Sequence, residues 1–580
     1  MTEQKLSGAE TIKKNSKNLR GNISAELADS NEFVSDESYE LLKFHGSYQG
    51  YDRDSATARK KQGLDKVWEF MLRLKIPGGR FTADQYLALD TLCDTHANGT
   101  LRITTRQTFQ FHCIVKAHLK PFIADINRIL LSTLGGCGDV VRNVITCPAP
   151  IHDNIHSVLE NACFTLAKEL APKTDAYWDI WLDGEKMDNY PFIPSPVENS
   201  TGSIEPLYGD TYMPRKFKIA LGQPEDNCMD VLCNDLALLA LFDGQELKGY
   251  NIALGGGLGM NHNNAKTYPY LAKPVAFIKP QDLVKASEAV VKLQRDHGDR
   301  GDRKHARLKY VVAEKGLGWT KSTLDGYFGS ELEAAKPTPN WAIVDHMGWH
   351  EQGNGKWFLG VPIPSGRIGD NIHGVNYRSA LREVISTYKM PLVLTVDQNI
   401  ILSEIEAGEK ISIERILRKH GVRLREDLTD LARNFIACVA LPTCGKALAE
   451  AERVQHPLEE ALQKLMDKHD IGKDKIAVRI AGCPNGCPRP YVGDIGIIGR
   501  TPEHYSIYVG GDFEGTRLNE KIFDKVPFDH ITTALEPLFE LYKKDRMRDE
   551  NFGDFCHRYG IELAKKNAIE SLSAPHKWAA

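Results

Sequence analysis

The segment LRITTRQTFQF at residues 101–111 returns in altered form as LVLTVDQNIIL at residues 392–402. The alignment places Thr104 on Thr395 and Gln107 on Gln398, and the same offset places RNVITC (142–147) on RNFIAC (433–438). KIPGGR (75–80) also recurs, as PIPSGR (362–367). Because two blocks share one offset, chance resemblance of strand segments does not explain them. We interpret the chain as a duplicated unit with pseudo-twofold symmetry, whose halves meet near residues 331–340.

The residues around the first block predict alternating strands and helices. Apolar and polar residues alternate from Phe70 to Ile76, as in a strand, and the Pro-Gly-Gly that follows predicts a turn. Residues 82–96 predict a helix with Thr82 as its N-cap. Residues 101–115 predict a second strand, and residues 119–134 a second helix. This order is that of a ferredoxin-like α+β fragment.

The two copies of the repeat differ in charge. Arg102 and Arg106 of the first copy correspond to Val393 and Asp397 of the second. Residues four apart on one strand share a face, so the two arginines predict a cationic face for an anionic ligand. The second copy carries paired cysteines instead, and Cys147 is interpreted as an unpaired relic of the repeat.

Two close pairs of cysteines stand in the second half. Five residues separate Cys438 from Cys444, and three residues separate Cys483 from Cys487. Prolines and glycines around the second pair predict a tight loop with amide groups turned toward sulfur. Four thiolates in two pairs favour an iron–sulfur cluster, which tolerates wide and uneven spacing. A structural zinc site and four buried reduced cysteines stay open as alternatives.

Composition restricts the class of protein. The chain has 580 residues and a formal net charge of −4, which argues against a general nucleic-acid binder. The sequence contains no apolar run of about 18 residues and no apolar signal-peptide core near its start, so we expect a cytoplasmic protein without a membrane segment. Its 12 cysteines suit a reducing compartment rather than a disulfide framework. Residues 1–60 are polar and predict an extended or partly disordered arm.

Three patterns mark the middle of the chain. Lys216 and Lys218 are two apart and predict side chains on one face of a strand, either a ligand-binding face or a solvent-facing edge. The glycine cluster at residues 255–257 resembles a phosphate loop with imperfect spacing, and close approach to a flat cofactor explains it as well. The charged run at residues 296–312 is either a solvated face or a source of further anion contacts.

Together these blocks resemble one known family. MLRLKIPGG, RITTRQTFQFH, RNV–TC, PRKFK, GGGLG, ACVALPTC and GCPNGC are similar to motifs of the sulfite/nitrite reductase family, and most closely to the hemoprotein beta subunits of its assimilatory sulfite reductases. The resemblance runs from about Leu41 to beyond Phe552. It implies a siroheme coupled to a 4Fe–4S cluster. It also implies that Cys438, Cys444, Cys483 and Cys487 hold the cluster, and that Cys487 is the axial thiolate of the siroheme iron.

The resemblance further implies which cationic residues serve the site. Siroheme carries eight carboxylates, and burying such a group requires many positive partners. The expected cofactor-binding residues are Arg102, Arg106, His112, Asn143, Gly255, Gly256, Gly257, Arg303, Lys304 and Arg307, with a packed core histidine as the alternative for His112. The expected catalytic set is Arg73, Arg142, Lys216 and Lys218, because guanidinium and ammonium groups bind oxyanions and lysine also relays protons.

The implied activity is the six-electron reduction of sulfite to sulfide in assimilatory sulfur metabolism. No flavin domain or complete NADPH site is recognisable, so we expect electrons from a separate NADPH-dependent flavoprotein alpha subunit with FAD and FMN, in a hetero-oligomer. A ferredoxin is the alternative donor, and a siroheme nitrite reductase the alternative enzyme. A non-catalytic electron-transfer or zinc-structured binding protein is the alternative from another class.

The architecture that we expect is α+β, with three domains around one central cofactor site. Ferredoxin-like halves at 61–134 and 346–420 form one domain together. A siroheme and substrate domain spans 135–345, and a cluster domain spans 421–580; both are of the α/β type. The N-terminal arm, 1–60, precedes them.

Overall fold

The computed structural model describes residues 5–185, 205–572, 576 and 578. The chain divides into two compact units. Unit one comprises Met1–Asp52, Arg59–Gly257 and Ala272–Val422, and unit two comprises Arg53–Ala58, Leu258–Leu271 and Arg423–Ala580. Among the described residues, no helix combines the length and the apolar composition that crossing a membrane requires.

Two five-stranded antiparallel sheets of unit one carry the repeat. The first has the order β1 (Ser47–Tyr51), β2 (Trp68–Arg73), β5 (Phe109–Ile114), β4 (Leu101–Ile103) and β12 (Arg367–Ile368). The second has the order β10 (Gly348–Glu351), β11 (Trp357–Val361), β14 (Ile400–Ile405), β13 (Leu392–Leu394) and β3 (Arg80–Phe81). The short strands β3 and β12 are exchanged, so each half lends one strand to the sheet of the other. The α+β class with ferredoxin-like halves and an internal repeat is thereby confirmed.

The repeated block folds as a hairpin in both halves. We expected one continuous strand over residues 101–115, and this prediction is wrong. The chain turns between β4 and β5 because Gln107 has a φ of 51°, and the amide of Gln107 donates to the Thr104 carbonyl at 3.2 Å. Gln398 repeats this turn with a φ of 68° and donates to the Thr395 carbonyl at 3.3 Å. The pseudo-twofold symmetry therefore extends to individual backbone angles.

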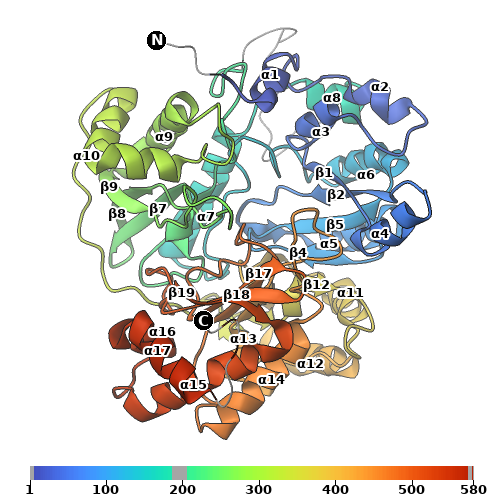
Figure 1. The fold of residues 1–580 in the computed structure, drawn as a ribbon. Helices are drawn as coiled ribbons and strands as arrows, with labels where there is room; N and C mark the ends of the chain where they lie inside the picture. Colours follow the sequence, from blue (N-terminus) through green and yellow to red (C-terminus); the bar gives the residue numbers. More distant parts are fainter. Residues whose placement is uncertain (1–4, 186–204, 573–575, 577, 579–580) are drawn as a thin grey trace. The chain divides into compact units, whose positions relative to one another are not determined.

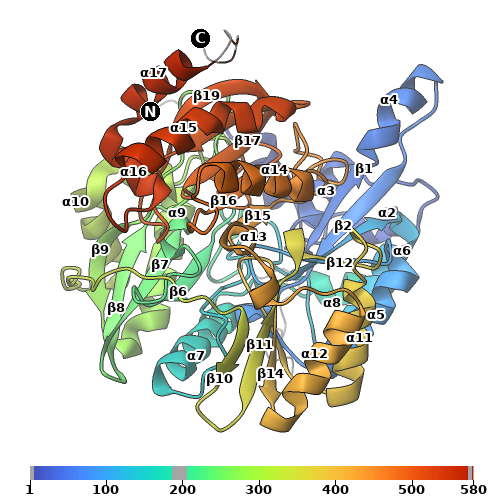
Figure 2. The ribbon, with the colours of Figure 1, turned by 90° about the horizontal axis from the view of Figure 1, so that it is seen from below.

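Helices cover the two sheets. The predicted helix after the first turn is α5 (Ala83–His96), and the Thr82 hydroxyl caps it by accepting from the Gln85 amide, as expected. The next helix, α6 (Lys116–Arg128), starts earlier and ends earlier than predicted. In the second half, α11 (Tyr377–Tyr388) and α12 (Lys410–Lys419) lie side by side near β14 (Figure 2).

The rest of unit one is built around a four-stranded sheet. Its order is β6 (Ile219–Gly222), β7 (Leu236–Asp243), β8 (Glu246–Leu254) and β9 (Lys273–Ile278) (Figure 1). Residues 141–145 run parallel to the chain leading into β6, through bridges Val141–Phe217 and Ile145–Ala220. Helices α7 (Asn154–Glu169), α9 (Leu283–His297) and α10 (Leu308–Phe328) complete this part, and α8 (Ala176–Trp181) contacts α6.

Unit two repeats that sheet. Its order is β15 (Phe435–Ala437), β16 (Val478–Ala481), β17 (Ile495–Thr501), β18 (His504–Val509) and β19 (Glu520–Pro527). The first three strands are parallel and the last two antiparallel, as in the 141–145, β6, β7, β8, β9 series. Helices α13 (Asp430–Arg433), α14 (Gln455–Lys468), α15 (Ile531–Asp545), α16 (Phe552–Tyr559) and α17 (Ile561–Ser571) belong to this unit.

The N-terminal segment is not extended where the structure describes it. Residues 8–42 form the helices α1 (Gly8–Lys14), α2 (Ile23–Ala28) and α3 (Asp36–Leu42), β1 follows, and α4 (Arg53–Lys61) comes next. Leu19, Ile23 and Leu42 are fully buried. Lys13 donates to the Met213 carbonyl at 2.7 Å and pairs with Glu10 at 2.5 Å. The expectation of a loose arm is wrong because a few apolar anchors and buried ion pairs fix a segment whose average composition is polar.

Candidate functional site

A row of arginines crosses the first sheet of unit one. Arg73 of β2 lies opposite Gln110 of β5, Gln110 lies opposite Arg102 of β4, and Arg102 lies opposite Arg367 of the exchanged strand β12. Residues opposite one another in neighbouring strands present their side chains on the same face. We call Arg73, Gln110, Arg102 and Arg367 the arginine row. Arg367 was missed in the sequence, where only its place in PIPSGR pointed to it.

His112 lies on this face, two residues beyond Gln110 in β5. It is almost fully buried, and the Arg367 guanidinium lies 3.4 Å from its Nδ1 atom. Burial, and then the charges of Arg367, Arg102 and Arg73, hold the pKa of His112 well below its usual range. The imidazole is therefore neutral, and it adds no further positive charge to the row.

Lys216 is the centre of a second group of cations in unit one. Burial lowers the pKa of Lys216 well below its usual value, and the charges of Arg215, Lys218, Arg142 and Arg307 lower it further. Like charges at this range destabilise one another unless an anion compensates them. We call Arg142, Arg215, Lys216, Lys218 and Arg307 the lysine cluster.

The predicted strand geometry of the two lysines is only partly right. Lys216 and Lys218 flank Phe217, which is fully buried and forms a parallel bridge with Val141, and β6 begins after them at Ile219. Both lysines are partly buried. The segment therefore lies inside the unit, and the solvent-facing edge strand considered as the alternative does not occur.

Arg106 does not stand on a strand beside Arg102, because it falls in the hairpin turn. Its guanidinium donates to the Asn234 side chain at 2.7 Å, to the Asn143 carbonyl at 2.5 Å and to the Ile219 carbonyl at 3.0 Å. Burial, and then the charge of Arg142, lower the pKa of Arg106 to about 9. Arg106 joins the loops under the lysine cluster, so the shared-face argument for this pair was wrong.

Asn143 and Arg142 lie next to this turn. Asn143 donates to the carbonyls of Ile76 at 2.7 Å and Arg106 at 2.8 Å, and it is buried. Arg142 donates to the Gly138 carbonyl at 3.1 Å and to the Tyr48 hydroxyl at 3.3 Å. Asn143 thus fixes the backbone that carries both arginines.

Arg307 is neutralised within the protein. Its guanidinium donates to both oxygens of Asp235, at 3.1 and 2.6 Å, and to the Gly256 carbonyl at 3.1 Å. Lys309, which the sequence reading did not select, donates to the Gly257 carbonyl at 3.1 Å. Burial, and then the charge of Arg307, lower the pKa of Lys309 to about 6.

Chain packing explains the glycine cluster. A Cβ on Gly256 would lie 2.2 Å from the Leu232 carbonyl, and one on Gly257 would lie 2.7 Å from the Arg307 guanidinium. Gly255 has a φ of 93°, which a residue with a side chain rarely adopts. These glycines let the loop approach its own backbone and Arg307, and nothing in their geometry requires a nucleotide phosphate.

The remaining expected contacts have partners within the protein, and Arg303 lies close enough to Arg215 of the lysine cluster to lower the pKa of Arg215. Arg303 pairs with the buried Asp139 at 2.8 Å, and Asp139 also lies 3.6 Å from Lys13 of α1. Lys304 is exposed, and its amide donates to Asp302 at 2.8 Å. Arg303 therefore anchors the N-terminal segment, and Lys304 faces solvent.

The four paired cysteines converge in unit two. Cys438 follows β15 directly, and its amide donates to the Ile480 carbonyl of β16 at 3.2 Å. Burial raises the pKa of the Cys438 thiol, and the charges of Cys487, Cys483 and Cys444 raise it further. Burial, and then Cys487, raise the pKa of Cys483 to about 12. Cys438 therefore lies within electrostatic range of the other three thiols, and Cys483 within range of Cys444 and Cys487.

Backbone amides support these sulfurs, as the loop composition predicted. The Gly482 amide donates to the Cys438 sulfur at 3.2 Å, and the Asn485 side chain donates to the Cys483 sulfur at 3.4 Å. Gly486 has a φ of 62° in the predicted tight loop. Cys483 is buried, Cys438 and Cys444 are half-buried, and Cys487 is exposed.

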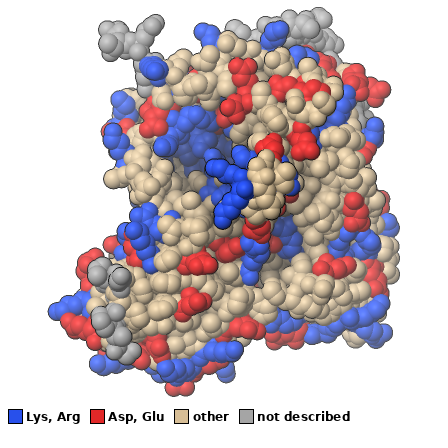
Figure 3. All heavy atoms as spheres, turned by 45° about the vertical axis from the view of Figure 1, so that its right-hand side comes forward, with Lys and Arg blue, Asp and Glu red and all other residues tan. Residues whose placement is uncertain are grey.

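The spacing of these thiols favours a cluster over a single ion. Zinc–sulfur bonds of about 2.3 Å place the sulfurs of a four-cysteine zinc site about 4 Å apart. Among the described residues, sets of three or more potential ligands within 4.8 Å of one another occur at Cys147, Asp226, Cys228 and His346 and at His469, Glu536 and Glu540, but not at the four paired cysteines. The residues present thus fit a larger cluster with thiolate ligands, and the arginine row and lysine cluster fit a polycarboxylate. Lysine and arginine side chains gather in and beside a hollow on one face of the molecule (Figure 3).

Family models match most of the chain. The nitrite and sulphite reductase 4Fe–4S domain matches residues 163–332 and 429–576, and the nitrite/sulfite reductase ferredoxin-like half domain matches residues 66–129 and 350–420. The chain belongs to the nitrite and sulfite reductase family. Membership gives it a siroheme and a 4Fe–4S cluster as cofactors, and the double matches agree with the repeat seen in the sheets.

Relatives of the family match the chain along its length. The sulfite reductase (ferredoxin) of Synechococcus elongatus is 40% identical over 572 residues, which cover 97% of this chain and 91% of the relative. The sulfite reductase (NADPH) hemoprotein beta-component of Staphylococcus saprophyticus is 40% identical over 558 residues, 96% of each chain. The structure of the Mycobacterium tuberculosis NirA protein superposes with a TM-score of 0.75 at 22% identity, covering 96% of this chain and 97% of that one, which supports the fold.

Proposed function

We propose that the chain reduces sulfite to sulfide, and that the lysine cluster binds the anion. The observation that carries this proposal is the environment of Lys216, where four cations lower the pKa of one partly buried lysine. Arg307 is compensated by Asp235, and Arg215 lies 4.0 Å from Asp139, but the five cations of the cluster outnumber these two carboxylates. Sulfite near neutral pH is a small oxyanion with up to two negative charges, which such a cluster would bind strongly.

Lys216 would then serve as a proton donor as well as a cation. Burial, and then the four neighbouring cations, lower its pKa well below the usual value, so its ammonium group gives up a proton more readily than that of an exposed lysine. An anion beside it favours the protonated form, and that proton would lie next to an oxygen that has to leave as water. Arg73, Arg142 and Lys218 would hold the other oxygens. When bound, the siroheme and the 4Fe–4S cluster would carry the electrons of the donor protein to the substrate.

The four cysteines of unit two are proposed as the cluster ligands. Cys438 lies within electrostatic range of Cys444, Cys483 and Cys487, and the loop at Gly482 donates an amide group to its sulfur. Cys487 is the exposed one of the four, which supports its role as the thiolate shared with the siroheme iron. The arginine row and Arg106 are proposed to face or support the siroheme carboxylates.

For the electron donor we propose a separate NADPH-dependent flavoprotein. Relatives named hemoprotein beta-component support this choice, because such a name implies a partner component. A ferredoxin is the second candidate, since the relative from Synechococcus elongatus is named for that donor.

One set of assays tests the proposal. Purified holoprotein is assayed with a chemically reduced dye, and kcat/KM is compared for sulfite and nitrite. A preference for sulfite with sulfide as product is expected, and a strong preference for nitrite would contradict the substrate. The dye is then replaced by a reduced flavoprotein subunit or by a reduced ferredoxin. Faster turnover with ferredoxin would reject the flavoprotein as donor.

A further inference from the structure

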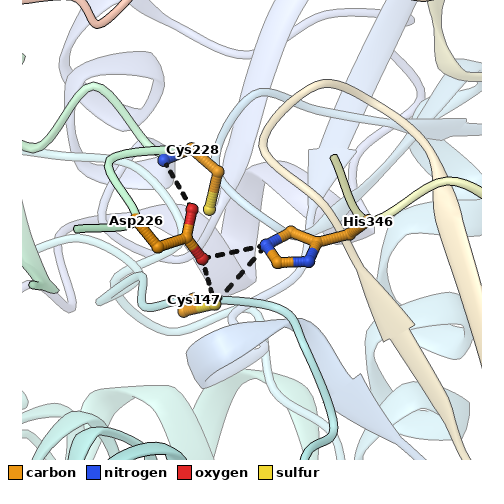
Figure 4. Close-up of side chains that lie close together, drawn as sticks. All are labelled: Cys147, Asp226, Cys228 and His346. Atoms are coloured by element: carbon orange, nitrogen blue, oxygen red, sulfur yellow. Dashed lines mark hydrogen bonds and ion pairs between the residues drawn. The ribbon is translucent and has the colours of Figure 1, made fainter. Parts of the chain in front are cut away.

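A second group of potential metal ligands lies in unit one, away from the four paired cysteines. Cys147, Asp226, Cys228 and His346 each offer one ligand atom, and these atoms all lie within 4.8 Å of one another. All four residues are at most 8% exposed. Figure 4 shows the Cys147 sulfur, a carboxylate oxygen of Asp226 and the His346 ring nitrogen facing one another, with the Cys228 sulfur beside them. Cys147 is therefore not the unpaired relic that the sequence suggested.

The distances suit one small ion. The Cys147 sulfur lies 3.1 Å from Oδ2 of Asp226 and 3.7 Å from Nε2 of His346, and these two atoms are 3.0 Å apart. Tetrahedral zinc has bonds of about 2.3 Å to sulfur and about 2.0–2.2 Å to nitrogen and oxygen, so its ligand atoms lie about 3–4 Å apart. The four atoms can thus meet around a zinc ion with only small shifts.

The charges of the group also require a cation or protons. Two thiols and a carboxylate share one buried space, and burying several negative charges without a partner is costly. The basic groups beside Cys147 are the imidazoles of His346 and His156. A divalent ion would stabilise both thiolates at once.

Surrounding groups orient the ligands. The amides of Cys228 and Val344 donate to Oδ1 of Asp226, at 3.3 and 3.2 Å, which leaves Oδ2 directed at Cys147 and His346. Nδ1 of His156 lies 2.7 Å from Asp153, and His156 hydrogen-bonds to Cys147. Such outer contacts hold the ligands of metal sites in place.

Strand register relates this group to the paired cysteines. Leu236 pairs with Ile219 as Ile495 pairs with Val478, and the same offset places Cys228 on Cys487. The repeat offset of the first block places Cys147 on Cys438. At the positions of Cys444 and Cys483 the first half has Asp153 and Pro224. The first half therefore keeps two of four thiols, and Asp226 and His346 bring the number of potential ligands back to four.

We propose that Cys147, Asp226, Cys228 and His346 bind one structural zinc ion. Thiolate, imidazole and carboxylate ligands suit zinc, and a closed set of four protein ligands is typical of structural sites. The ion would fasten residues 341–346, which lead from the junction of the repeat halves at 331–340 into the second half, because His346 is one of its ligands. This segment already contacts the loop that carries Asp226 and Cys228, because the Asn227 amide donates to the Ala342 carbonyl at 2.7 Å and the Ala342 amide donates to the Pro224 carbonyl at 3.0 Å.

Metal analysis of purified holoprotein tests this site. The full chain is produced with iron and zinc supplied, dialysed against EDTA, and analysed for zinc, iron and labile sulfide. We expect one zinc per chain, which Cys228→Ser or His346→Ala removes while iron and labile sulfide stay. Cys483→Ser should do the reverse, losing iron and keeping zinc, so failure of this site and failure of the proposed function are distinguishable. Cys163→Ala, at a buried cysteine outside both groups, is the matched control.

Two measurements on the unmodified protein do not depend on the variants folding. Zinc-edge X-ray absorption should show two sulfur and two nitrogen or oxygen neighbours. Thiol counting after denaturation should show Cys147 and Cys228 reduced. Protein without zinc, zinc with four sulfur neighbours, loss of iron instead of zinc in Cys228→Ser, or a disulfide between Cys147 and Cys228 would each overturn the proposal.

Discussion

The two ferredoxin-like sheets of unit one have the same backbone and opposite chemistry. In the first sheet the cross-strand row is Arg73, Gln110, Arg102 and Arg367. In the second sheet the corresponding row is Gly360, Ile401, Val393 and Arg80. The residue from the exchanged strand is an arginine in both rows, while the others change from polar or charged to small or apolar.

The surroundings of each row explain the difference. Val393 and Ile401 are buried with Phe358 in an apolar cluster, against which Ile151 packs. Arg80 turns to Glu160, 2.8 Å away. The first row instead concentrates positive charge around a neutral histidine. Both halves therefore keep the hairpin and the exchanged strand, whereas the residues on this face serve packing in one sheet and suit an anionic ligand in the other.

The two α/β sheets give a second such pair. Asp235 and Asp494 occupy matching places before β7 and β17, and each accepts from the backbone amide of the matching residue, Lys218 at 2.9 Å and Ala477 at 2.8 Å. Asp235 then pairs with Arg307, whereas Asp494 accepts from the Gly553 amide at 2.9 Å. Asp235 therefore pairs directly with a guanidinium, whereas Asp494 accepts from two backbone amides.

The largest loss of cofactors and activity is expected in the cysteine loops of unit two, which differ most between the two repeats. Cys487→Ser should remove the iron–sulfur cluster and the coupled siroheme spectrum, and abolish sulfite reduction, because serine is a poor ligand for soft metals. Iron, labile sulfide and the visible spectrum are the measurements. Full reductase activity in this variant would refute the shared thiolate, and Cys163→Ala should keep both cofactors.

Lys216→Met should lower kcat/KM for sulfite about a hundredfold to ten-thousandfold, because it removes a cation and a proton donor from the anion site. Siroheme and cluster content should stay unchanged. The pH profile adds a readout that a structural role would not give. Since turnover requires the protonated lysine, activity of the unmodified protein should fall as pH rises through the pKa of Lys216 in the anion complex.

The matched control for this variant is Lys304→Met, which removes an exposed lysine of the same charged run as Arg303. It should leave kcat/KM for sulfite unchanged. Equal losses in both variants would mean that the overall charge of the protein, and not the lysine cluster, draws the anion.

Exchanging residues between the two rows should be tolerated in one direction only. Arg102→Val copies the second sheet into the first, so the protein should fold and lose several-fold in siroheme content. Val393→Arg places an unpaired charge in an apolar cluster and should cost about 3 kcal/mol or more of stability. Siroheme absorbance per chain and thermal unfolding of the cofactor-free protein measure the two effects, and full siroheme content in Arg102→Val would contradict the assignment of the row.

The same Asp→Asn substitution should lower the stability of the protein by different amounts at the two matching aspartates. Asp235→Asn leaves Arg307 buried without its partner and should cost about 3–5 kcal/mol. Asp494→Asn should cost less, and its cost should shrink as pH rises from 5 to 8. Burial raises the pKa of Asp494 from 3.8 to about 7, so the folded protein holds a proton there that the unfolded chain releases. The stability from this proton is complete below pH 3.8 and lost as pH rises through 7.

Apparent melting temperatures of both aspartate variants at pH 5 and pH 8 measure this difference. An Asp494→Asn cost that grows with pH would mean that the carboxylate is charged in the folded protein. Equal costs for the two variants at pH 8 would show that the Arg307 partner adds nothing to the role of Asp235.

Short-range patterns in the sequence predicted much of this structure. The Thr82 cap and the tight loop at Gly486 depend on neighbouring residues and were correct, and the repeat was correct because its two copies keep similar short stretches of sequence. The hairpin within residues 101–115 was missed because glutamine at a positive φ, unlike Gly or Asn, gives no turn signal in the sequence. With that turn, the shared face of Arg102 and Arg106 disappeared.

Long-range pairing accounts for the other differences. Nothing near Arg303 in the sequence indicates that Asp139 neutralises it, and nothing near Cys147 indicates that His346 lies beside it. Arg367 enters the arginine row only because β12 is exchanged. Lys309 stood in the charged run but was not selected, and a search for lysines flanked by apolar residues could have found it.

The exchange of β3 and β12 has a consequence for how the molecule could be divided. Each half-sheet ends on a strand that the other half supplies, so a chain cut within residues 331–340 would yield two fragments that each lack an edge. Neither fragment would form a complete sheet by itself, and mixing the two fragments would restore the edge strand of both sheets. The two halves of the duplicated chain therefore depend on each other's strands, which disfavours their evolution into separate proteins.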